Sequence, residues 1–241
     1  MNPFTCWKRV LQPPAILFCF LGTLYGCAKF PSGVPASAKT RIIFSMTVDG
    51  KINPNYIYVV AIRTSDQRYP TDNLGPLPVI QPPWGNGIIG GAATDYIIYT
   101  PMQTIPFDIY KFLNTDLTEK KFIGYPIRFD QISADSKTLT FEVYLNQLAD
   151  NSSVESATLK SLQVNFLTMN KIPTSNSDTK IWDAIGDNSH LLTGQGWVNI
   201  PLDTSGRYNN QYFGNIEPRG DVSDPDLDLV DFAVEVILSS P

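Results

Sequence analysis

The chain has 241 residues, enough for one large β domain or two small ones. Hydrophobic residues make up 43% of it and aromatic residues 12%, which excludes a disordered tail and indicates a packed core. The formal net charge is −5 and the sequence has no basic run, so its electrostatics argue against nucleic-acid binding.

The first residues have the organisation of a secretory signal. Lys8 and Arg9 give a positively charged start, and residues 15–25 form a mostly apolar run. A bilayer-spanning helix needs about 20 apolar residues, so this run is too short to remain in a membrane. Its length fits the hydrophobic region of a signal peptide, about 7–15 residues. We therefore expect residues 1–26 to be a signal peptide that is removed.

The segment Leu24-Tyr25-Gly26-Cys27 resembles the lipobox of bacterial lipoproteins, in which an aliphatic residue, a small or aliphatic one and Gly, Ala or Ser precede the cysteine. Tyr25 departs from this pattern. The resemblance implies that the Cys27 sulfur receives a diacylglyceryl group, with acyl chains such as palmitate, and that signal peptidase II cuts after Gly26. It also implies a place in the bacterial cell envelope, at the outer membrane if the source has one.

The distribution of cysteines agrees with this interpretation. Cys6 and Cys19 lie in the expected signal peptide, and no cysteine follows Cys27. The alternatives are that Cys27 is an incidental cysteine, or that a signal peptidase cuts at the A-x-A pattern of residues 36–38. The Pro, Ser, Gly and Ala of residues 28–40 are typical of a flexible linker. We therefore expect a signal peptide over residues 1–26, a lipidated tether over 27–40 and a single domain over 41–241.

Alternation of apolar and polar residues dominates the sequence from residue 41 onward. The clearest strands are expected at residues 42–48, 56–62, 139–145 and 230–238. Weaker strand patterns cover residues 95–100, 106–112, 121–129, 162–168 and 196–202. About nine strands without disulfides predict an all-β fold, an antiparallel two-sheet sandwich that is immunoglobulin-like or related, with at most one short helix.

The connections carry their own signals. Residues 49–55 contain Asp-Gly and Asn-Pro pairs, which predict a hairpin between the first two strands. Residues 180–192 are expected to form a short helix or turn. Two stretches, residues 65–94 and 203–225, are long enough to be either functional loops or loosely ordered segments.

A cluster of acidic residues precedes the last strand. Asp224, Asp226 and Asp228 alternate along the chain, and Glu235 falls at the twelfth position counted from Asp224. Carboxylates with this spacing can surround calcium, so these three aspartates are the candidate metal ligands. An EF-hand is disfavoured because Leu229 stands where that loop needs glycine, which leaves a sandwich-loop site. The alternative is an acidic turn that leads into the final strand.

Other motifs give little support to catalysis. Residues 85–90 match G-x-G-x-x-G, but no strand-then-helix pattern surrounds them, so nucleotide binding is disfavoured. The one histidine, His190, lies in a turn-like stretch, and no hydrolase or zinc motif occurs. We therefore predict no catalytic residue, although a carboxylate pair of the glycosidase kind stays open.

Aromatic residues in or near the long loops suggest a ligand surface. Trp84, Tyr208 and Tyr212 are the candidate ligand-facing rings, because flat rings stack on sugar faces. Alternatively, such side chains plug the ends of the sandwich.

These features together predict a lipid-anchored envelope protein whose sandwich is a binding or structural module. The expected partners are the membrane, through the lipid on Cys27, and an envelope protein, a polysaccharide or a small ligand. Calcium is the one cofactor that the sequence leaves open. The alternative functions are an envelope glycan-active hydrolase and a calcium-dependent carbohydrate-binding module.

Overall fold

A computed structural model describes residues 40–80, 85–149, 153–175, 177–185 and 196–239. The predicted signal peptide, Cys27 and most of the tether lie outside these residues, as do Trp84 and His190. Their expected roles therefore stay predictions. Among the described residues, no helix is long and apolar enough to cross a membrane.

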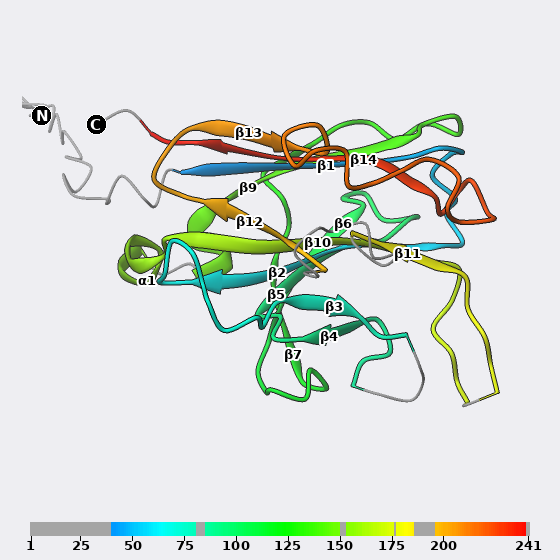
Figure 1. Ribbon diagram of the computed structural model, residues 1–241, viewed down its shortest axis with the longest axis horizontal. Coiled ribbons are helices and arrows are strands. Elements are labelled where there is room, and N and C mark those ends of the chain that lie inside the picture. The colour runs from blue at the N-terminus through cyan, green and yellow to red at the C-terminus, as the bar shows by residue number, and fades with distance from the viewer. Residues whose placement is uncertain (1–39, 81–84, 150–152, 176, 186–195, 240–241) are drawn as a thin grey trace, which may run out of the picture. The chain divides into compact units, whose positions relative to one another are not determined.

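The first sheet has the strand order β13-β14-β1-β9-β8, and all its pairings are antiparallel. Its central strand β1 pairs with β14 on one side and β9 on the other (Figure 1). The strands are β1 (Arg41–Val48), β8 (Arg128–Phe129), β9 (Thr138–Tyr144), β13 (Gly206–Asn209) and β14 (Leu229–Ile237).

The second sheet follows the order β11-β10-β2-β5-β6-β7, with β12 also paired to β10. Its strands are β2 (Ile57–Ser65), β5 (Asp95–Tyr99), β6 (Phe107–Phe112), β7 (Lys120–Gly124), β10 (Ser161–Met169), β11 (Trp182–Ala184) and β12 (Val198–Pro201). A 3-10 turn, η2 (Leu145–Ala149), and one short helix, α1 (Ser153–Thr158), connect β9 to β10.

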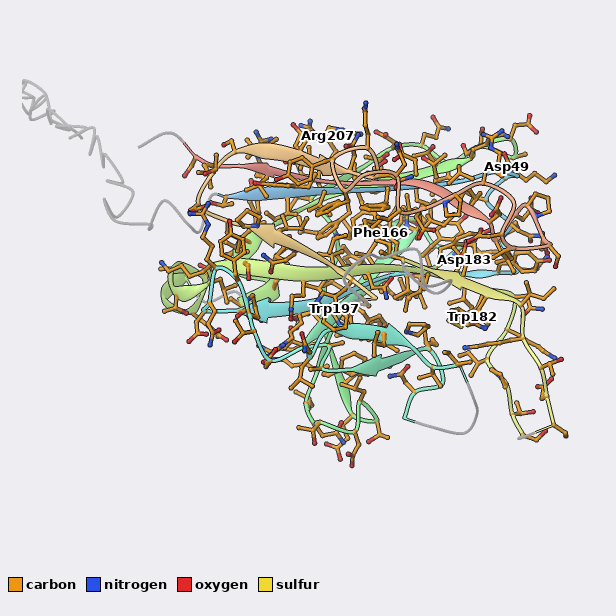
Figure 2. The ribbon with its side chains drawn as sticks, in the orientation of Figure 1. Asp49, Phe166, Trp182, Asp183, Trp197 and Arg207 are labelled. Atoms are coloured by element: carbon orange, nitrogen blue, oxygen red, sulfur yellow. The ribbon has the colours of Figure 1, made fainter. Side chains whose placement is uncertain are left out.

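The two sheets pack face to face around an apolar core. Alternate residues of β1 are buried, because one face of a half-exposed strand meets the opposite sheet. Phe166 of β10 and Phe232 of β14 come from different sheets and are both almost fully buried, with their ring centroids 5.4 Å apart. Figure 2 shows Phe166 between the two layers. The predicted all-β sandwich is confirmed.

A third layer covers the outer face of the second sheet. The hairpin of β3 (Pro76–Pro78) and β4 (Ile89–Gly91) lies below β2 in Figure 1. Ile88 and Ile89 pack there with Val59, Ala61 and Leu167 in a second apolar cluster. Part of the predicted long loop at residues 65–94 is therefore a β-hairpin that packs on the outer face of the second sheet. Burial on both faces explains why all nine residues of β10 are buried.

The predicted hairpin at residues 49–55 is wrong, because β1 and β2 belong to different sheets. The two edges of β1 are paired with β14 and β9, so no edge is left for β2. The connecting segment instead bonds to the loop before β14: Asp49 N–H donates to Asp228 O at 2.8 Å, and Gly50 N–H donates to Pro225 O. The segment 49–55 does turn the chain, but it leads from β1 in the first sheet to β2 in the second sheet.

Two further expectations need correction. The strand predicted at residues 121–129 divides into β7 and β8, which lie in different sheets. Gly124 has φ 139° and Pro126 has no N–H, so the ladder ends between them. The helix or turn expected at 180–192 begins instead as strand β11, which pairs with Leu167–Met169. The additional short strands β3, β4, β11 and β13 lie in segments where the pattern predicted loops or a helix.

Candidate functional site

The structure separates the three predicted calcium ligands. Asp224 accepts a hydrogen bond from the Tyr56 hydroxyl at 2.7 Å through Oδ2, and from Asp226 N–H at 3.0 Å through Oδ1. The hydrogen bond to Asp224 raises the pKa of Tyr56. Both carboxylate oxygens of Asp224 therefore hold the turn before β14 in its conformation.

Asp226 has the same kind of structural contacts. Its Oδ1 accepts Lys51 N–H at 2.9 Å and its Oδ2 accepts the Asn53 amide at 3.3 Å. Its backbone carbonyl accepts the buried Tyr58 hydroxyl at 2.9 Å. Asp224 and Asp226 thus tie the 224–228 turn to the 49–56 connection, which agrees with the acidic-turn alternative.

Asp228 faces a different group of acids. One carboxylate oxygen from each of Asp183, Asp221 and Asp228 lies within 4.8 Å of the others. Asp183 is on β11, at the edge of the second sheet (Figure 2), whereas Asp228 directly precedes β14 of the first sheet. Asp221 belongs to the loop between β13 and β14. We call this group the aspartate cluster.

Backbone N–H groups fix the two buried members of the aspartate cluster. Asp183 is 0% exposed; its Oδ1 accepts Ala184 N–H at 2.8 Å and its Oδ2 accepts Leu229 N–H at 2.7 Å. Asp228 is 1% exposed, and its Oδ2 accepts Gly220 N–H at 2.8 Å. Burial raises the pKa of Asp228, and the neighbouring Asp221 carboxyl raises it further. Such a group can hold a cation or share a proton.

The predicted ligand-facing aromatics occupy different environments. Tyr208 is 8% exposed and belongs to the core, with its ring 5.1 Å from that of Tyr212 in an edge-to-face contact. Tyr212 is 64% exposed and presents its ring to solvent. Of the two tryptophans in the described residues, Trp197 is buried and packs against Gly75, and Trp182 is half-buried against the second apolar cluster.

A row of aromatic rings crosses β5, β6 and β7. The Tyr96 ring stacks at 5.1 Å on both Phe112 and Tyr110, Tyr110 meets Phe122 edge-on at 5.7 Å, and Phe122 meets Tyr125 at 5.1 Å. Each such pair adds about 0.5–1.5 kcal/mol beyond simple burial. The row runs from buried Tyr96 to exposed Tyr125 and so joins the second apolar cluster to the surface.

Lys120 and Asp108 border this row with opposite charges. The Lys120 ammonium lies 4.6 Å from the centroid of Tyr110, a distance typical of a cation–π contact. The Tyr110 hydroxyl donates to Asp108 at 3.3 Å. Charged groups therefore stand beside the rings that approach the surface.

Four large apolar side chains are exposed where this row ends: Phe122 at 45%, Tyr125 at 43%, Ile127 at 42% and Tyr144 at 39%. Gln147 joins two of these positions, since its amide donates to Tyr125 O at 2.8 Å and its carbonyl accepts Tyr144 N–H at 2.9 Å. Ile127 N–H donates to Glu142 O, which places Ile127 beside β9 as well. We call Phe122, Tyr125, Ile127 and Tyr144 the β7–β8 surface.

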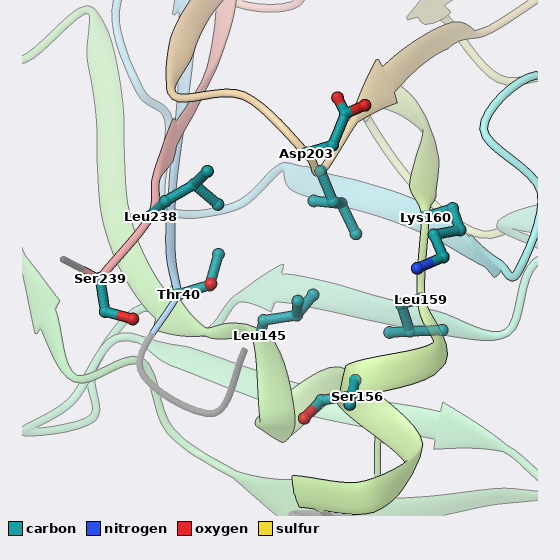
Figure 3. A pocket seen from close by; sticks show the side chains of 10 residues that line it. Thr40, Leu145, Ser156, Leu159, Lys160, Asp203, Leu238 and Ser239 are labelled. Carbon is teal, nitrogen blue, oxygen red and sulfur yellow. The ribbon is translucent and has the colours of Figure 1, made fainter. Parts of the chain in front are cut away.

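Two cavities in the described part of the chain contain few acidic groups. One, of about 250 Å³, is lined by residues that include Thr40, Leu238, Lys160 and Asp203 (Figure 3). The other, of about 450 Å³, has Arg63 and Lys111 in its wall. The aspartate cluster lines neither cavity.

The glycine-rich segment at residues 85–90 forms a turn before β4. The side-chain oxygen Oδ1 of Asn86 accepts Ile88 N–H at 2.9 Å and Ile89 N–H at 2.8 Å, and Gly87 has φ 74°. A strand follows where a phosphate-binding motif needs a helix N-terminus. The segment therefore shapes the third layer.

Sequence reasoning missed Asp183, which is 38 residues from the nearest other member of the aspartate cluster, and it missed the β7–β8 surface. Nothing in the sequence shows that Phe122 and Tyr144 both belong to an exposed surface. The chain matches no known protein family and no curated protein sequence.

Proposed function

We propose that this chain is a lipid-anchored cell-envelope protein whose β-sandwich binds another envelope component. The observation that supports binding is the β7–β8 surface. It consists of three exposed aromatic rings and one exposed aliphatic side chain, on β7, on the connection from β7 to β8 and at the end of β9. Large groups of neighbouring exposed apolar side chains often mark sites where a protein binds a partner. The lipid on Cys27 supplies the anchorage that the lipobox resemblance implies.

A polysaccharide or an envelope protein suits this surface. Rings stack on the apolar faces of sugars, and the Lys120 ammonium lies over Tyr110, the ring that meets Phe122. A protein partner would bury the same rings, which are enriched in interface cores. The two cavities are less suited to glycan hydrolysis, because that chemistry needs paired carboxylates and Asp203 is the one described acid in either wall.

Replacing Cys27 by Ala should abolish labelling with a radioactive fatty acid in a bacterial host and leave residues 1–26 attached, because the cut by signal peptidase II follows lipidation of the cysteine. The matched control is Cys19→Ala, which removes a cysteine of the signal peptide and should leave labelling intact. If Cys27→Ala is still labelled, or is still cut after Gly26, the lipid is not on Cys27 and the proposal is wrong.

The double substitution Phe122→Ala, Tyr125→Ala should lower the affinity for the partner at least tenfold, because truncating central aromatic anchors costs about 2 kcal/mol or more of binding energy. Affinity electrophoresis in purified envelope polysaccharide measures the glycan case. A photo-crosslinking residue at position 125 in growing cells detects a protein partner.

The control for this prediction is Tyr212→Ala, which removes a more exposed ring from the loop between β13 and β14. If the double variant still binds the partner and Tyr212→Ala does not, the proposal is wrong about the surface. The ligand would then bind at Tyr212, a ring that the sequence predicted to face a ligand.

A further inference from the structure

We infer that Asp183, Asp221 and Asp228 form a binding site for a divalent cation of the calcium class. This group shares only Asp228 with the set that the sequence suggested. The inference is independent of the lipid anchor and of the β7–β8 surface.

The dimensions of the aspartate cluster suit one ion. Ligand oxygens lie 2.3–2.6 Å from calcium, so two oxygens on opposite sides of one ion are about 5 Å apart. The three carboxylate oxygens lie within 4.8 Å of one another, which places them inside this limit. Calcium takes six to eight oxygens, and backbone carbonyls and water complete such shells.

Asp228 carries the second observation. The side chain is 1% exposed, its Oδ2 accepts Gly220 N–H and Val222 N–H also lies near the carboxylate, but no hydrogen bond from the described residues reaches Oδ1. A buried carboxylate oxygen without a partner is costly, and the Asp221 carboxylate beside it adds repulsion. A cation between these carboxylates removes both costs at once.

The remaining contacts hold the ligands in place before a cation arrives. Leu229 N–H and Ala184 N–H fix both oxygens of Asp183, and Gly220 N–H fixes Asp228. Each donor leaves its carboxylate oxygen a further lone pair for the ion. Ligands oriented in this way by their neighbours are characteristic of metal sites.

The position of the cluster gives the ion a structural consequence. Asp183 comes from β11 of the second sheet and Asp228 from the start of β14 of the first sheet, and Asp221 lies in the β13–β14 loop. One ion would therefore join the two sheets at this end and fix the loop between them. Its binding energy adds to the free energy of unfolding.

The test uses the full chain, purified in detergent and freed of metal with EDTA, with thermal unfolding and titration calorimetry as readouts. Calcium chloride at a hundredfold excess over the dissociation constant should raise the melting temperature of the wild type by about 5–10 °C. Asp221→Asn removes the least buried ligand and should lose this shift and the calorimetric heat. The control Asp226→Asn lowers the melting temperature on its own, but its shift with calcium should remain.

Comparison without metal adds a second readout. In EDTA, Asp221→Asn should be at least as stable as the wild type, because it removes a repulsive charge beside Asp228; in calcium the order should reverse. No shift of the wild type with calcium overturns the inference, and so does an unchanged shift in Asp221→Asn. A wild type that ignores calcium but gains stability from pH 7 to pH 5 would show a shared proton in place of the ion.

Discussion

Asn165→Ala is expected to lower the free energy of unfolding by about 2–6 kcal/mol, because it leaves two buried backbone groups without partners at about 1–3 kcal/mol each, and a third group that is half-buried. The Asn165 amide donates to Pro76 O at 3.1 Å and to Gly196 O at 2.6 Å, and its carbonyl accepts Ile185 N–H at 3.0 Å. Urea denaturation followed by tryptophan fluorescence measures the loss.

The position of Asn165 explains the size of this effect. Along one edge of β10, residues 167–169 pair with β11 and residues 161–164 pair with β12. The side chain of Asn165 bonds the backbone where the edge changes from one partner to the other. Asn199→Ala on β12, which removes one hydrogen bond to Arg68 O, is the control and should cost no more than about 1.5 kcal/mol. Equal losses in the two variants would contradict this role.

Phe166→Ala should lower the free energy of unfolding by about 3–5 kcal/mol, the usual cost of truncating a buried phenylalanine. The ring is 0% exposed and meets Phe232 of the opposite sheet, so its removal opens a cavity between the layers. Thermal and urea unfolding both report the change.

Phe122→Ala is the matched control, because its ring is 45% exposed and its loss opens no buried cavity. It should cost much less than Phe166→Ala. A small effect of Phe166→Ala would mean that the two sheets are not packed against each other as described.

Much of the sandwich could be predicted because a half-buried strand records its two faces in alternate residues. The β1 pattern from Ile42 to Val48 is of this kind, and the structure buries alternate residues there. The prediction of a hairpin at residues 49–55 was wrong because Asp-Gly and Asn-Pro pairs specify a turn. They do not specify which strand the next strand pairs with. Pairing depends on which neighbours β1 already has, and those are about 90 residues and more away in sequence.

The aspartate cluster was beyond sequence reasoning for a similar reason. Asp183 is a single acid between Trp182 and Ala184, and only the pairing of β11 with β10 brings it near Asp228. Alternation grouped Asp228 with Asp224 and Asp226, whose carboxylates accept hydrogen bonds from backbone N–H groups and a tyrosine hydroxyl. The sequence does contain a sign of the role of Asn165, because it is the one asparagine among the mostly apolar residues 161–169.

Mass spectrometry of the protein isolated from a bacterial membrane fraction tests the proposed anchorage most directly. We predict a chain that begins at Cys27, with the mass of a diacylglyceryl group on its first residue and no residue from the preceding 26. A chain that begins after Ala38, or that retains residues 1–26 with an unmodified Cys27, would contradict it.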